Sequence, residues 1–213
     1  MGTLMDLLCY HSKKALLVFF ALLLHSCGYL VQPTVKTGIV NLKPGTYQID
    51  PQHTSVLFKI NHMGMSTFVG RFNSAEAALE FDPAHMENAS LSAVINIASI
   101  DVNNAELKQT LLGTSWFAAE RYPQAMFKTT SVQVIDQSRA RFTGNLTLHG
   151  VTAPIVLEVT FNGGGENMLT GRYTIGFTAT TRFNRSQFGM DYLIPAIGDE
   201  VNVEVFAEFQ KRQ

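Results

Sequence analysis

The sequence predicts an all-β domain of about eight antiparallel strands with one short helical insertion. From residue 46 to residue 210, apolar and polar residues alternate in one run after another, and turn residues separate the runs. A single segment, at about 103–120, has the spacing of a helix instead. Many long antiparallel strands in one domain form either a sandwich or a closed barrel, because open strand edges invite aggregation. The alternation does not distinguish between these two architectures.

The predicted strands share a period of two, which places every second residue on the same face. In SVLFKIN, for example, Val56, Phe58 and Ile60 alternate with Leu57, Lys59 and Asn61. Clusters such as HMG, DP and NGGG lie between the runs and predict turns. The same alternation occurs in five further ranges: 91–98, 140–150, 154–161, 171–179 and 200–209.

The helical insertion is indicated by Leu107 and Leu111, which lie four residues apart as on one face of a helix. Either Asn103 or Asn104 can cap its start, and Gly113 provides a stop signal. The insertion therefore divides the β-domain into two parts.

The first 26 residues predict a signal peptide of the lipoprotein type. Lys13 and Lys14 precede ten consecutive apolar residues, 15–24. Ten helical residues rise roughly 15 Å, about half the hydrocarbon thickness of a bilayer. This run is therefore too short to span a membrane and has the length of a signal-peptide core.

Residues 24–27, LHSC, resemble the lipobox of bacterial lipoproteins, in which the cysteine is acylated and becomes the new N-terminus. We therefore expect lipid attachment at Cys27, with residues 27–45 forming a lipidated N-terminus and tether. An ordinary secretory signal with an incidental Cys27 is the alternative. We expect the exported chain to lie on the periplasmic side of a bacterial membrane. Gly28 after the cysteine favours the outer membrane.

The composition excludes several classes of function. A formal net charge of −1 argues against a nucleic-acid partner, which requires a concentrated basic face. Cys9 leaves with the signal peptide and Cys27 carries lipid, so neither a disulfide framework nor a cysteine metal site is expected. Only 15% of residues are charged while the chain has 15 phenylalanines, a combination that indicates extensive apolar lining. Nothing in the sequence specifies an oligomeric state.

No catalytic residue and no metal site are predicted. The chain has no Gly-x-Ser-x-Gly elbow, no haem attachment motif and no phosphate-binding loop. No two histidines have the i, i+2 or i, i+4 spacing that presents paired ligands, and His53 and His62 are nine residues apart. We therefore expect a protein that is not an enzyme.

A series of short motifs resembles successive landmarks of the YceI-like family, in order, over roughly residues 47–209. This resemblance implies an elongated, lipocalin-like antiparallel barrel over 46–210 that binds a long isoprenoid or similar amphiphile in its lumen, usually outside the cytoplasm. The helical insertion departs from the pattern, since many members carry Arg-Asp-x-His-Leu where this chain has AELKQ. The head-group contacts of those members therefore do not carry over. The motifs are DPQHTSV (50–56), GRF (70–72), Phe117, Tyr122-Pro123, Phe127, TGNLTLHGVT (143–152), FNRSQFGM (183–190) and GDEV (198–201).

Apolar side chains on the inward faces are the candidates for ligand contact, although plain core packing would explain each of them. Burying an alkyl chain gains about 0.8 kcal/mol per CH₂, so ten carbons give roughly 8 kcal/mol before ordering costs. The candidates are Phe58, Ile60, Phe72, Leu79, Ile95, Ile97, Phe127, Phe142, Leu146 and Phe177.

Three arginines, Arg71, Arg182 and Arg185, could hold an anionic or carbonyl head group by forked hydrogen bonds. Alternatively, each pairs with a carboxylate such as Asp191, Asp199 or Glu200 and fixes a loop.

The expected function is an extracytoplasmic lipoprotein that binds or sequesters a long-chain isoprenoid or quinone-like lipid. It would use no other cofactor, and its acyl anchor would attach it to a membrane. Two alternatives stay open: a structural or stress-response envelope protein with a filled core, and a pocket enzyme acting on a lipid or quinone.

Overall fold

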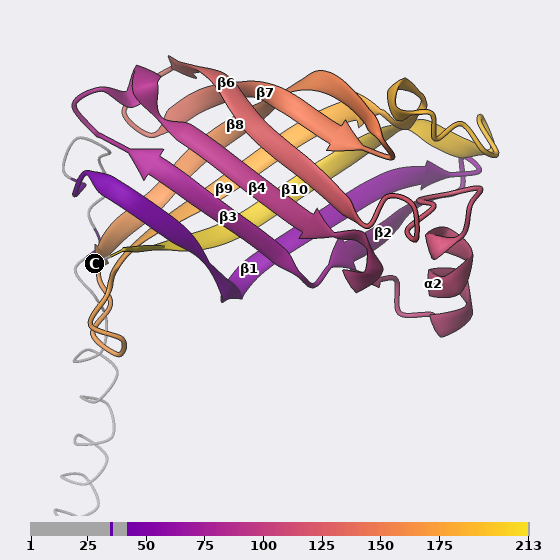
Figure 1. Cartoon of the computed structure of the whole chain (residues 1–213), viewed down its shortest axis with the longest axis horizontal. Helices are drawn as coiled ribbons and strands as arrows, with labels where there is room; N and C mark the ends of the chain where they lie inside the picture. Colours follow the sequence, from indigo (N-terminus) through magenta and orange to yellow (C-terminus); the bar gives the residue numbers. More distant parts are fainter. Residues whose placement is uncertain (1–34, 36–41, 213) are drawn as a thin grey trace, which may run out of the picture.

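The computed structural model describes residue 35 and residues 42–212, in which the alternating segments form strands (Figure 1). The signal peptide and Cys27 lie outside the described residues. The strands are β1 (Gly45–His62), β2 (Ser66–Phe72), β3 (Ala75–Phe81), β4 (Ser90–Asn96), β5 (Ile100–Asp101), β6 (Gln124–Val134), β7 (Arg139–Leu148), β8 (Val151–Glu166), β9 (Tyr173–Asn184) and β10 (Ile197–Lys211). The helical segments are α2 (Ala105–Leu112) and the 3₁₀ turns η2 (Met86–Asn88), η3 (Ile97–Ser99) and η4 (Arg185–Phe188).

These strands close into an eight-membered antiparallel barrel, as predicted. One edge of β1 pairs with β10, and its other edge pairs with β3 and then β2. β2 and β3 are the two halves of one bent strand, and β4 and β5 are the halves of the next, because β4 pairs with β3 while β5 pairs with β2. Every member of the ring is thus antiparallel to its neighbour in sequence. Closure pairs most of the sheet edge and so reduces the edge problem of an open sheet, although β5 pairs only with β2 and residues 151–157 of β8 have no partner on β9.

The period of two separates an inner from an outer face. In β7, Phe142, Leu146 and Leu148 are buried, whereas Arg141 and Asn145 are exposed. At the end of the barrel where the described chain begins, Leu42 and Tyr47 are buried in an apolar cluster that also contains residues from β3, β8, β9 and β10. The barrel is therefore closed at this end, near the C-terminus (Figure 1).

The other end carries α2 (Figure 1). Of the two asparagines that could cap it, Asn104 does so, because its Oδ1 accepts a hydrogen bond of 2.9 Å from the Leu107 amide. The helix ends at Leu112, earlier than the predicted insertion, and residues 113–122 continue as turns. Leu111 packs in a small cluster with Ile100 and Val102, which holds the helix against the end of the barrel. Within residues 35 and 42–212, no helix has the length and apolar character needed to cross a membrane.

A wide bulge interrupts β1. Ile49 is opposite Phe209 and Thr54 is opposite Ala207, so that residues 50–53 face a single residue of β10. The Asp50 carboxylate accepts hydrogen bonds from the amide of Gln52, from His53 Nδ1 and from Gln210 Nε2. Burial acts to raise the pKa of Asp50, but the hydrogen bonds from His53 and Gln52 outweigh it and lower the pKa. The DPQH motif therefore forms and holds this bulge.

Candidate functional site

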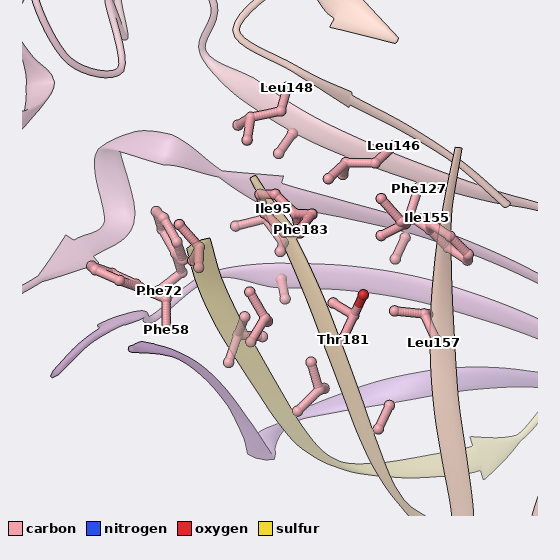
Figure 2. A pocket seen from close by; sticks show the side chains of 18 of the residues that line it. Phe58, Phe72, Ile95, Phe127, Leu146, Leu148, Ile155, Leu157, Thr181 and Phe183 are labelled. Carbon is pink, nitrogen blue, oxygen red and sulfur yellow. The ribbon is translucent and has the colours of Figure 1, made fainter. Parts of the chain in front are cut away.

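A cavity of about 580 Å³ lies inside the barrel, and all eight members of the ring contribute to its wall. This volume lies within the roughly 300–1,000 Å³ typical of sites for small molecules and cofactors. The wall is almost entirely apolar, and Figure 2 shows side chains from several strands converging on the lumen.

All ten apolar residues predicted as inward-facing line this cavity, and contact of each with a ligand remains a prediction. Two further wall positions are glycines that the alternation did not single out. A Cβ atom on Gly144 would lie 2.4 Å from Cζ of Phe127, and one on Gly70 would lie 2.3 Å from Cζ of Phe58. The two rings therefore lie flat on glycines of the neighbouring strand, which keeps them against the wall. The ten residues are Phe58, Ile60, Phe72, Leu79, Ile95, Ile97, Phe127, Phe142, Leu146 and Phe177.

The lumen is open at the α2 end. Among the wall residues, Thr110 of α2 and Tyr192 and Leu193 of the loop before β10 are exposed to solvent. Glu76, at the start of β3, is the other exposed member. At the opposite end Phe81, Met86 and Phe161 are buried, so the lumen ends blindly there.

Thr181 supplies a polar atom inside the lumen. It lies on β9 immediately beyond the last residue paired with β8, Thr180, and it is surrounded by apolar side chains (Figure 2). Its Oγ1 is buried, and no hydrogen-bond partner for it exists among the described residues. A buried hydroxyl without a partner costs roughly 1–3 kcal/mol, so this position favours a ligand that can hydrogen bond.

Arg185 is buried at the open end of the lumen, and it is fixed by the protein itself. Its guanidinium donates to the carbonyls of Gly198 (2.9 Å), Met190 (2.6 Å), Tyr192 (2.9 Å) and Ile197 (2.9 Å). Burial lowers the pKa of this guanidinium. Arg185 therefore holds the loop between η4 and β10, through carbonyl groups rather than through the carboxylates considered from the sequence.

The other two candidate arginines lie outside the lumen. Arg71 is exposed, donates to Asn73 Oδ1 and lies 3.8 Å from Asp101. The Arg182 Nε donates to Asn202 Oδ1 (2.9 Å) and lies 3.4 Å from Glu200. The structure therefore does not bring the three arginines together into one head-group site, because alternation of the strands directs Arg71 and Arg182 outward.

One group of metal-ligand side chains comes together in the described part of the chain, where the sequence predicted none. Ligand atoms of Asp50, His53 and Glu208 lie within 4.8 Å of one another. The spacing of histidines in the sequence could not predict this group, because the bulge in β1 brings Glu208 of β10 beside Asp50 and His53. Hydrogen bonds to Asp50 hold the bulge and His53, and the pairing of β1 with β10 places Glu208 beside them.

The chain is similar in sequence to proteins of a known family. The family model of the YceI-like domain matches residues 47–209. The chain belongs to the YceI-like family. Relatives include a UPF0312 protein of Pseudomonas savastanoi pv. phaseolicola, 38% identical over 146 residues that cover 68% of this chain and 76% of the relative. A UPF0312 protein of Vibrio parahaemolyticus is 34% identical over 170 residues, covering 78% of this chain and 87% of the relative.

Solved structures share the YceI-like barrel. BcnA of Burkholderia cenocepacia superposes with a TM-score of 0.69 at 24% identity, covering 75% of this chain and 98% of BcnA. The YceI protein of Campylobacter jejuni gives a TM-score of 0.65 at 29% identity, covering 73% of this chain and 91% of that protein. A domain from Saccharophagus degradans described as polyisoprenoid-binding gives 0.57 at 12% identity, covering 80% of this chain and 100% of that domain, and supports the fold alone.

Proposed function

We propose that this YceI-like protein binds one long-chain, uncharged amphiphile, such as an isoprenoid or quinone-like lipid, in the lumen of its barrel. The observation that carries the proposal is the apolar cavity of about 580 Å³ inside the barrel, which has one open and one closed end. The polyisoprenoid-binding description of a structural relative agrees with it.

The size of the cavity supports occupation by a ligand. Burying an alkyl chain gains about 0.8 kcal/mol per CH₂, so ten carbons inside this lumen of about 580 Å³ would contribute roughly 8 kcal/mol. The whole unfolding free energy of a typical domain is only about 5–15 kcal/mol. An apolar chain in the lumen would restore the missing contacts, whereas a filled-core structural protein would have no such space.

The ligand is uncharged because the buried part of the described wall has no free group to balance a charge, whereas Glu76 is exposed and His62 is half-buried. Arg185, the buried cation of the wall, already donates to four carbonyls. Thr181 Oγ1 would instead hydrogen bond a carbonyl or hydroxyl group of the ligand. No buried carboxylate or histidine lines the lumen within residues 42–212, which favours binding over catalysis.

The location is also part of the proposal. The signal-peptide pattern and the LHSC motif support export and lipid attachment at Cys27, with outer-membrane residence favoured by Gly28. An acyl anchor would keep the barrel beside a membrane that supplies such ligands.

Native mass spectrometry with lipid extraction tests this function. The full chain purified from a bacterial envelope should carry close to one long-chain amphiphile per molecule. An apo mass that is unchanged after incubation with isoprenoids and quinones would overturn the proposal and favour the structural alternative.

A further inference from the structure

The open end of the barrel exposes four large apolar side chains on two adjacent loops. Met63 and Met65, in the turn between β1 and β2, are 56% and 76% exposed, and Tyr192 and Leu193, in the loop before β10, are 46% and 48% exposed. The Met63 amide donates a hydrogen bond of 2.7 Å to the Ala196 carbonyl, so the two loops form one unit. We call these four side chains the mouth surface.

Two of these residues have a costly backbone conformation. Met63 has φ 57° and Leu193 has φ 60°, in the left-handed region where glycine and asparagine are favoured. For other residues this conformation costs on the order of 1 kcal/mol. Each side chain stays about half exposed in the protein. The apolar character of these two positions is therefore not explained by the stability of the barrel.

The mouth surface lies between uncharged neighbours on most sides, although the exposed Asp191 immediately precedes Tyr192. Neither residues 63–70 nor residues 192–198 contain an aspartate, glutamate, lysine or arginine. A surface of this kind can enter the interfacial region of a bilayer without dehydrating a charged group. Trp116 lies at the same end with its ring 5.4 Å from that of Tyr192, and tryptophan and tyrosine are enriched where membrane meets water.

The mouth surface continues directly into the lumen, because Tyr192 and Leu193 belong to both, and Trp116 lines the lumen beside them. An amphiphile could pass from a bilayer into the barrel along apolar side chains throughout. We propose that the mouth surface docks on the interfacial region of a lipid bilayer, and that the ligand enters and leaves the lumen there. This inference rests on the proposed lipid-binding function.

The closed end of the barrel offers a matched control. Met168 and Leu169, in the turn between β8 and β9, are 63% and 81% exposed. They resemble the mouth surface in apolar character and exposure, but neither lines the apolar lumen, and Glu166 and Arg172 flank them. Serine substitutions at this turn remove similar apolar area from the opposite end.

Trp116, the one tryptophan of the chain, provides a local probe of docking. The full chain is mixed with dioleoylphosphatidylcholine vesicles that contain phosphatidylcholine with a nitroxide on its head group. The nitroxide quenches fluorophores at the bilayer interface and, being on the head group, stays outside the apolar lumen. Quenching of Trp116 is expected in the unaltered chain and in the Met168→Ser/Leu169→Ser control. The variant Met63→Ser/Met65→Ser/Leu193→Ser should require roughly tenfold more lipid for half-maximal quenching.

Three results would overturn the proposal. The first is an absence of quenching in the unaltered chain, and the second is equal quenching in the mouth variant. The third is self-association of the chain that the mouth variant abolishes, because this would assign the surface to contact with a second copy. Thermal unfolding checks that the mouth variant folds. If that variant does not fold, the single substitution Met65→Ser is tested in its place. Lipid content is measured separately on the same preparations. Quenching without a co-purified lipid would contradict the proposed function and leave the docking intact.

Discussion

Replacing Arg185 by alanine distinguishes a loop clamp from a contact with the ligand. The guanidinium makes four hydrogen bonds of 2.6–2.9 Å, two to carbonyls of the loop before β10 and two to carbonyls of the first residues of β10. At about 1 kcal/mol each, their loss lowers the free energy of unfolding by roughly 4 kcal/mol. This corresponds to a fall in Tm of about 10 °C for a domain of this size. The variant Arg185→Lys keeps three donors on a flexible ammonium. Its free energy of unfolding should therefore lie between those of the unaltered chain and the alanine variant.

Urea unfolding followed by far-UV circular dichroism measures this change, and Trp116 fluorescence reports the loop, because the Arg185 guanidinium lies 5.6 Å from the Trp116 ring. An alanine variant within about 0.5 kcal/mol of the unaltered chain would refute the clamp, since surface substitutions without structural roles stay within this range. If that variant also loses its bound lipid, Arg185 meets the ligand as the sequence suggested.

Three further predictions concern the wall and the bulge. Ala179→Phe places a ring in the lumen and should reduce bound amphiphile per chain several-fold by native mass spectrometry, while the outward-facing Thr180→Phe should not; equal lipid content in both variants would contradict the lumen site. Gly144→Ala should destabilise the fold by roughly 1–3 kcal/mol in urea unfolding, because its Cβ would lie 2.4 Å from the Phe127 ring and 2.5 Å from the Lys128 carbonyl oxygen, and an unchanged midpoint would show that both the ring and the backbone of β6 move to accept the methyl group. The hydrogen bond from Asp50 raises the pKa of His53, so an NMR titration should give a midpoint above the ordinary value of about 6.5 that returns to it in Asp50→Asn. Because the folded pKa is the higher one, the pair stabilises the fold below pH 6.5 and this contribution is lost as the pH rises through the folded pKa; an unchanged midpoint in the asparagine variant would exclude Asp50 as the cause.

Local patterns determined much of the fold in advance. The period of two in 154–161 and 200–209 assigned inner and outer faces correctly, since a strand has only two faces to choose between. Asn104 and Gly113 bounded the start and end of α2 for equally local reasons. Closure into a ring depends on the pairing of β1 with β10, about 150 residues apart, and periodicity carries no information about it.

The polar features of the site were harder to predict, because they depend on contacts between distant segments. Arg185 is a clamp only because the loop before β10 turns its carbonyls toward it. Thr181 is distinguished from other strand threonines by the end of pairing between β8 and β9 beside it. Met63 and Leu193 meet at one end of the barrel although 130 residues separate them in sequence.

The two ends of the barrel give the molecule a direction. The described chain begins at the closed end with Leu42, and the lumen opens at the other end. Fifteen residues from Cys27 to Leu42 span at most about 50 Å. If Cys27 carries lipid, as proposed, the attachment point and the opening lie at opposite ends of the barrel. Exchange of a ligand with the anchoring membrane would then require the barrel to turn its open end toward that membrane.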